Sequence, residues 1–146
     1  MKKVLSVVLF AATMLTAGAA TAQSPNYNSG PVWRVVYYSI KPGQGDAFWK
    51  DIRDHFHPVY EEFKKAGLIS DYKFFTNPVS DHPNDWDVAL AILYPNWAAL
   101  DELDAKGTTI ATKHYGSREA MIEAGKRRSE LRDVVANHLA REVILK

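Results

Sequence analysis

The stretch Val32-Trp33-Arg34-Val35-Val36-Tyr37-Tyr38-Ser39-Ile40 decides the fold of this chain. Valine, tyrosine and tryptophan favour β-strands, in which successive side chains point to opposite faces of a sheet. Both alternating sets of positions are rich in apolar side chains: Trp33, Val35 and Tyr37 form one set, and Val36, Tyr38 and Ile40 form the other. A strand of this kind is typical of a sheet that is covered on both faces.

A long helix is predicted to follow this strand. Residues 44–66 carry apolar side chains at steps of three or four, and Gly67 is a suitable terminator. Pro58 has no backbone N–H to donate, so we expect a kink or a restart of the helix near His57.

Turn residues and periodicity place the other elements. In order, they are strands at 69–76 and 86–94, a helix at 97–106, a long helix at 117–135 and a closing strand at 139–145. Asn96 and Ser117 are expected to cap the two helices, and Gly107 to stop the first of them. The stretch 108–116 between the helices is interpreted as irregular.

The order of elements predicts one α+β domain at 32–146. It is the ferredoxin-like βαββαβ layout with an extra C-terminal helix, in which helices cover one face of an antiparallel sheet. The second face is then uncovered in a monomer, although its side chains are apolar. A second copy of the same sheet would hide it, so we expect a homodimer.

The first 22 residues have the layout of a secretory signal peptide. Lys2 and Lys3 precede an apolar run, and Ala20-Thr21-Ala22 supplies the small residues that a signal peptidase requires. We expect cleavage after Ala22, a disordered lead-in at 23–31, and a protein exported across the inner membrane, in the periplasm. The alternative is an uncleaved membrane anchor, for which the apolar run is short.

Composition excludes several classes of function. Without Lys2 and Lys3, the 18 basic residues become 16 against 17 acidic ones, which gives no reason to expect nucleic acid. The chain has no cysteine, so thiolate catalysis, zinc–thiolate sites and iron–sulfur clusters are excluded. It also lacks a phosphate-binding glycine loop, a Gly-x-Ser-x-Gly elbow and a His-Glu-x-x-His pair.

The strand at 32–38, followed by Lys41-Pro42-Gly43-Gln44-Gly45-Asp46-Ala47-Phe48, resembles the dimeric α/β-barrel superfamily. This superfamily includes antibiotic-biosynthesis monooxygenase-like, EthD-like and NIPSNAP-like proteins, and the likeness covers most of 32–146. It implies a homodimer whose sheets form a barrel, with a cavity in each subunit between the sheet and its helices. Some relatives use that cavity for cofactor-free oxidation of polycyclic phenols, and others degrade haem or isomerise small lactones.

The first candidates for chemistry are His57, Tyr60 and Arg34. His57 lies beside the Pro58 break and titrates near neutral pH, so it is a candidate proton acceptor, or else a solvent-facing or capping histidine. Tyr60 and Trp49 lie one and two helical turns away. Arg34 lies mid-strand among apolar residues and needs a partner. The partner would be a carboxylate, such as that of Glu142 or Asp87, or a bound anion.

The candidates for ligand binding are aromatic. Tyr37, Tyr38, Trp49 and Trp86 would line a cavity for a flat ligand, or else fill the core or a dimer contact. His114 would lie on a loop over the cavity mouth, and by analogy with haem-handling relatives it is a candidate iron ligand. Asp81, His82 and Asp85 match no standard metal-ligand spacing, so a plain turn is favoured and no metal is expected.

These observations favour one function and leave two alternatives. The favoured function is an exported homodimer that binds a small aromatic or hydrophobic molecule without a cofactor. It would oxidise or isomerise that molecule if it is an enzyme, with His57 removing a proton from an acidic phenol. The first alternative is a non-catalytic periplasmic interaction protein with a filled cavity, and the second is a haem-binding protein.

Overall fold

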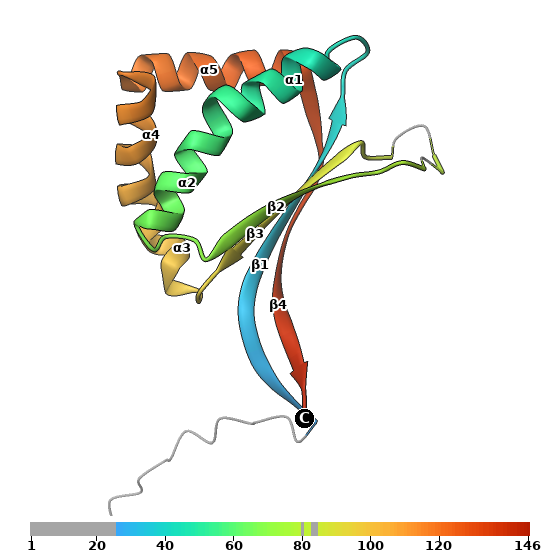
Figure 1. Ribbon diagram of the computed structural model, residues 1–146. Helices are drawn as coiled ribbons and strands as arrows, with labels where there is room; N and C mark the ends of the chain where they lie inside the picture. Colours follow the sequence, from blue (N-terminus) through green and yellow to red (C-terminus); the bar gives the residue numbers. More distant parts are fainter. Residues whose placement is uncertain (1–25, 80, 83–84) are drawn as a thin grey trace, which may run out of the picture.

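The computed structural model describes residues 26–79, 81–82 and 85–146. Four strands form one antiparallel sheet in the order β2-β3-β1-β4 (Figure 1). They are β1 (Tyr27–Ile40), β2 (Asp71–Thr76), β3 (Val88–Tyr94) and β4 (Arg132–Leu145). The sheet confirms the ferredoxin-like α+β layout, because the two central strands are the first and third in the chain.

Two helical arms connect the strands and lie on one side of the sheet (Figure 1). The first arm comprises α1 (Gly45–Asp51), the π-helical turn η1 (Ile52–Phe56) and α2 (His57–Lys65). The second comprises α3 (Ala98–Glu102), the π-helical turn η2 (Leu103–Gly107), α4 (Thr108–Tyr115) and the extra helix α5 (Arg118–Leu131). The predicted restart at His57 is confirmed, since α2 begins there directly after η1.

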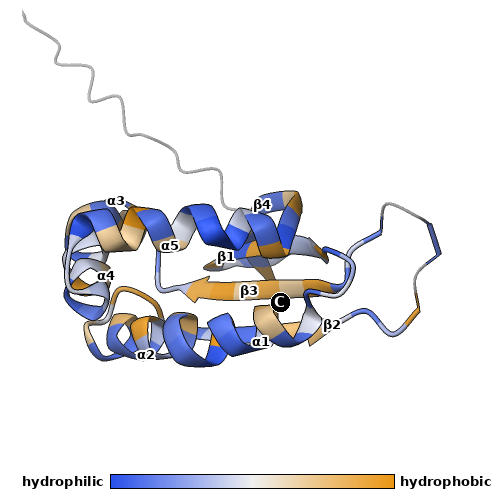
Figure 2. Cartoon of the chain, turned by 90° about the horizontal axis from the view of Figure 1, so that it is seen from above, coloured by the Kyte–Doolittle hydropathy of each residue, from blue (hydrophilic) through white to orange (hydrophobic). Residues whose placement is uncertain are grey.

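The core lies between the sheet and the first helical arm. The central strands contribute the buried side chains of Val32, Val36, Tyr38, Val88, Leu90, Ile92 and Tyr94, and the arm contributes Phe48, Ile52, Val59 and Phe63. Each buried side chain of this size contributes about 1.5–3 kcal/mol. Figure 2 shows β3 as a continuous apolar strand, whereas much of α1 and α5 is hydrophilic.

The opposite face of the sheet is also apolar. Trp33, Val35 and Tyr37 of β1 lie opposite Leu93, Ala91 and Ala89 of β3 in the register of the two strands. The three β1 side chains are half-buried, and in the described part of the chain both helical arms lie on the other side of the sheet. The expectation of one covered and one uncovered face is therefore met in the single chain.

Strands β1 and β4 are both longer than the sequence predicted. Tyr27 to Ser29 pair with the end of β4, so 27–31 belongs to a strand and not to a disordered lead-in. Helix α5 ends at Leu131, and β4 begins at Arg132 rather than at 139. Valines at 134 and 135 favour a strand, and β1 offers a partner along its whole length. The proposed signal peptide lies outside the described residues.

Gly107 does not stop the helix as predicted. Its φ is −64° and the chain continues as α4, which ends at Gly116 with φ of 84°. Gly107 is needed for close packing, because a Cβ there would lie 3.0 Å from Leu103 Cδ1 and 3.5 Å from Phe63 Cζ. The two predicted caps are confirmed: Asn96 Oδ1 accepts from Ala99 N at 3.1 Å, and Ser117 Oγ accepts from Ala120 N at 3.0 Å.

Helix α5 is tied to the first arm by one ion pair. Arg128 Nε donates to Asp51 Oδ2 at 2.7 Å, and Arg128 also contacts the Tyr115 hydroxyl. Both charged side chains are largely shielded, with exposures of 20% and 17%. Across the described residues, no helix is long and apolar enough to cross a bilayer.

Replacing Arg128 tests whether this ion pair holds α5 in place. We expect Arg128→Met to lower the free energy of unfolding by about 3 kcal/mol, because Asp51 is left shielded from water without a counter-charge. Urea denaturation followed by circular dichroism measures the change. The matched control is Arg127→Met at the exposed neighbouring position, and equal effects of the two variants would contradict a structural role for the pair.

Candidate functional site

A cavity of about 320 Å³ lies between the sheet and the first helical arm. Its floor consists of side chains from three strands: Arg34, Val36, Tyr38, Leu90, Ile92, Arg132, Val134 and Asn137. Phe56 and Tyr60 form the wall that the helical arm supplies. The structure thus brings together Arg34, Tyr38 and Tyr60 of the predicted site residues.

The π-helical turn explains how the helical wall is formed. A π-helical turn inserts an extra residue relative to an α-helix and so changes which side chains face the sheet. Phe56 ends this turn, and its ring stacks on that of Tyr60, with centroids 3.7 Å apart and planes inclined by 19°. The stacked pair separates this cavity from a second one, of about 260 Å³, that lies under α4 and α5.

The cavity reaches solvent beside the edge strand β4. Val134 lines it and is 61% exposed, and Asn137 lines it and is also exposed. Leu90 and Ile92 on the central strand are buried at its base. A molecule could therefore enter past β4 and contact the aliphatic side chains of Leu90 and Ile92 in the floor.

Arg34 has neutral partners inside the cavity. Its Nε donates to Asn137 Oδ1 at 3.0 Å, and its side chain hydrogen-bonds the hydroxyl of Tyr94. Neither carboxylate expected from the sequence is its partner. Glu142 Oε2 accepts from Trp33 Nε1 at 2.7 Å, and Asp87 Oδ2 accepts from the backbone N of Ile40 at 2.6 Å. The expectation of a partner from Glu142 or Asp87 is therefore wrong.

Arg132 was not predicted from the sequence as a site residue. Its Cζ lies 3.6 Å from the centroid of the Tyr38 ring and 5.8 Å from that of Phe48. Its Nη1 is buried and has no hydrogen-bond partner among the described residues. The side chain is thus held by aromatic faces and has an unused donor.

The environment of Tyr60 keeps its phenol neutral. Burial raises the pKa of Tyr60 well above its usual value, and the nearby Tyr94 and Tyr38 raise it further. The positive charges of Arg34 and Arg132 act in the opposite direction but do not cancel this effect. Tyr60 is therefore suited to donate a hydrogen bond at neutral pH and not to accept a proton.

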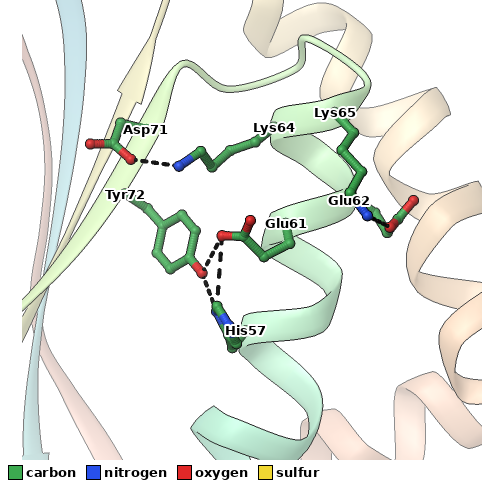
Figure 3. A network of polar contacts seen from close by, with 7 residues as sticks. All are labelled: His57, Glu61, Glu62, Lys64, Lys65, Asp71 and Tyr72. Carbon is green, nitrogen blue, oxygen red and sulfur yellow. Dashed lines mark hydrogen bonds and ion pairs between the residues drawn. The ribbon is translucent and has the colours of Figure 1, made fainter.

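His57 lies in a different place, on the side of α2 that faces β2 (Figure 3). Its Nδ1 contacts the hydroxyl of Tyr72, and that hydroxyl donates to Glu61 Oε1 at 2.9 Å. The His57 side chain is 57% exposed and does not line the cavity. The same view shows Lys64 paired with Asp71 at 3.0 Å, which also ties α2 to β2.

The remaining aromatic candidates lie outside the cavity. Trp49 packs against Phe48 and Phe74 between α1 and β2, with ring centroids 5.2 and 6.1 Å away. Tyr37 lies on the open face of the sheet, where it meets Trp86 edge to face at 5.3 Å. Trp49 therefore contributes to packing between α1 and β2, and Tyr37 and Trp86 contribute to the open face of the sheet.

His114 lies within α4 and not on an irregular loop. Its Nε2 is 3.2 Å from His55 Nδ1, and it lines a groove of about 590 Å³ between α2 and α4. Asp85 closes the loop before β3 by accepting from Asn77 Nδ2 at 2.9 Å. No group of three potential metal ligands occurs among the described residues.

Comparison with known proteins identifies only the fold. No family model matches the chain, and no curated protein matches it. Among solved structures it is similar to HapK from Hahella chejuensis, with 11% identity and a TM-score of 0.51 over 76% of this chain and 91% of HapK.

Two further structures have lower TM-scores. One is a dimeric protein of unknown function with a ferredoxin-like fold from Bacteroides fragilis: 14% identity, TM-score 0.41, covering 80% of this chain and 97% of that one. The other is a dimeric ferredoxin-like protein from an uncultured marine organism: 12% identity, TM-score 0.44, covering 82% and 96%.

The titration of Tyr72 tests the His57–Tyr72–Glu61 contacts. Burial raises the pKa of Tyr72, and its hydrogen bond to Glu61 raises it further. The stability that the neutral phenol contributes is therefore fully present below about pH 10 and is lost as the pH rises through the raised value. A spectrophotometric pH titration follows the ultraviolet absorbance of the phenolate. We expect the wild-type and Tyr72→Phe curves to differ only at pH values above the range in which ordinary tyrosines ionise.

Glu61→Gln supplies the control for this titration. It removes the negative charge beside the phenol and should move the pKa of Tyr72 part of the way back toward its usual value. If Tyr72→Phe instead lost phenolate absorbance, relative to the wild type, in the pH range in which ordinary tyrosines ionise, the His57–Tyr72–Glu61 contacts would be contradicted.

Proposed function

We propose that this protein binds a small aromatic or hydrophobic molecule in the cavity between the sheet and the first helical arm. The observation that carries the proposal is the cavity itself, an aromatic-walled space of about 320 Å³ that reaches solvent beside β4. Ligand pockets in proteins begin at about 300 Å³ and combine apolar walls with a few polar groups. A filled interior would instead have favoured the non-catalytic interaction protein.

The cavity supports binding better than proton abstraction. Within the described part of the chain, its lining residues include no histidine, aspartate, glutamate or lysine, and Tyr60 holds its proton. A general base must lie within hydrogen-bond reach of the proton that it removes. His57, the base expected from the sequence, points toward Tyr72 and Glu61 (Figure 3). Binding is therefore the function proposed, with no catalytic step assigned to His57.

We also propose that the protein is an exported homodimer that pairs through the open faces of its sheets. The support for pairing is the apolar composition of this face, which includes Trp33, Val35, Tyr37 and the 50% exposed ring of Phe75. Exposed apolar side chains gathered on one face of a sheet, here beside Lys73 and His138, are typical of an interaction site. Export rests on the first 22 residues of the sequence.

Obstructing the cavity mouth tests the binding proposal. We expect the wild-type protein to bind 2-naphthoate or 2-naphthalenemethanol in calorimetric titrations. We expect Val134→Trp to weaken binding of both at least about ten-fold, because the indole fills the entrance. Val79→Trp is the control, since Val79 is 66% exposed and lies in the loop after β2. Absence of binding to the wild type, or equal weakening by both variants, would contradict the proposal.

A charge on the open face tests the pairing. We expect wild-type protein to elute with twice the chain mass in size-exclusion chromatography with light scattering. Phe75→Lys should shift it to the monomer mass, because a lysine would face the partner sheet without a counter-charge. Val79→Lys should remain dimeric. A monomeric wild type would contradict sheet-to-sheet pairing.

A further inference from the structure

The described residues that line the cavity supply two guanidinium groups and no carboxylate. Arg34 and Arg132 both line it, and its other lining residues are aliphatic, aromatic or the amide of Asn137. A positive charge taken out of water is costly unless a counter-charge or a full set of hydrogen bonds compensates it. Arg34 and Arg132 are both half-buried, so an anion placed between them would compensate two positive charges that are partly shielded from water.

The chain shows elsewhere how it compensates a shielded arginine. Arg128 is paired with Asp51 at 2.7 Å and also contacts the Tyr115 hydroxyl. Among the residues that the structure describes, Arg34 is bonded to the neutral Asn137 and Tyr94, and the carboxylates of Glu142 and Asp87 are bonded to other groups. Arg34 therefore differs from Arg128 in having no carboxylate partner among the described residues.

Arg132 supplies a free donor at the same place. Its Cζ lies 3.6 Å from the centroid of the Tyr38 ring, within the range of a cation–π contact, and the side chain lines the cavity. Its Nη1 is buried and unpartnered within the described chain. The fork of a guanidinium matches the two oxygens of a carboxylate, and such charge-assisted bonds are about twice as strong as neutral ones.

We propose that the ligand of this cavity is a small aromatic carboxylate, an inference that rests on the proposed binding function. Its carboxylate accepts hydrogen bonds from Arg132 and Arg34. Its ring lies on the aliphatic side chains of Leu90 and Ile92, against the stacked Phe56 and Tyr60. A cavity of about 320 Å³ is at the small end of ligand pockets, which favours one or two rings.

The neutral phenol of Tyr60 fits the same ligand. Burial holds its pKa above the usual value, so it stays protonated and can donate to an anion at neutral pH. Arg34, Arg132 and Tyr60 all line this one cavity. Donors therefore converge on the ligand from β1, β4 and α2.

The test compares 2-naphthoate with its neutral counterpart 2-naphthalenemethanol by isothermal titration calorimetry. We expect wild-type protein to prefer the acid by about ten- to a hundred-fold, the range of a charge-assisted hydrogen bond. Arg132→Met should abolish most of this preference, because it should weaken binding of the acid far more than binding of the alcohol. Arg141→Met, at an exposed position on the same strand, should keep the full preference.

Thermal melting of each variant shows whether it is folded, and Arg34→Met provides a second test if Arg132→Met does not fold. Equal binding of the acid and the alcohol by wild-type protein overturns the carboxylate inference but leaves the binding function standing. Unchanged preference in every folded arginine variant overturns it as well. Binding of neither compound overturns the inference together with the proposed function.

Discussion

The structure depends on β1, which is paired on both edges and apolar on both faces. It pairs with β3 over Val32 to Tyr38 and with β4 from Tyr27 to Ile40. These pairings satisfy much of the backbone of the strand. Its two sets of side chains face opposite sides of the sheet and therefore need different neighbours. One set is covered by the helical arm that follows the turn at Gly43, whose φ of 76° reverses the chain. The other set is left for a second molecule.

The same strand connects the fold to the site. Arg34, Val36 and Tyr38 lie on its helix-facing side, so the residues that hold the core also form the floor of the cavity. The pairing with β4 brings Asn137 beside this floor, and the first residue of β4 adds Arg132. Because the open face lies on the opposite side of the sheet, pairing of two copies there would leave the cavity mouth at β4 accessible.

Much of the fold could be predicted from the sequence, because its signals are local. The alternating strand at 32–40, the turn at Gly43 and the capping side chains of Asn96 and Ser117 each act within a few residues. Gly107 was misinterpreted because its role is a contact with Leu103 and Phe63, which lie in two different helical segments. The lead-in was misinterpreted because its partner strand lies more than a hundred residues away.

The site was harder to predict for two physical reasons. The sequence predicts a helix through 135, and a helical Arg132 would not be assigned to the sheet. Arg132 lies on the cavity floor because the chain becomes a strand at that residue. The π-helical turn shifts the faces of α2 relative to those of α1, so an α-helical spacing could not place the first arm on the sheet, where Tyr60 lines the cavity and His57 and Trp49 do not. Arg34 could be identified from the sequence because a charged residue among apolar strand residues is itself a signal. Such an arginine needs a partner, and a bound anion is one of the partners that the sequence allows.

Native mass spectrometry of the protein, purified gently from its own host, tests the central claim most directly. The account predicts a dimer in which each chain carries a small additional mass, and acid extraction should release an aromatic carboxylate. The same dimer without added mass, or with a cationic or purely aliphatic compound, would contradict the account of the cavity. A monomer would contradict the pairing of the open sheet faces.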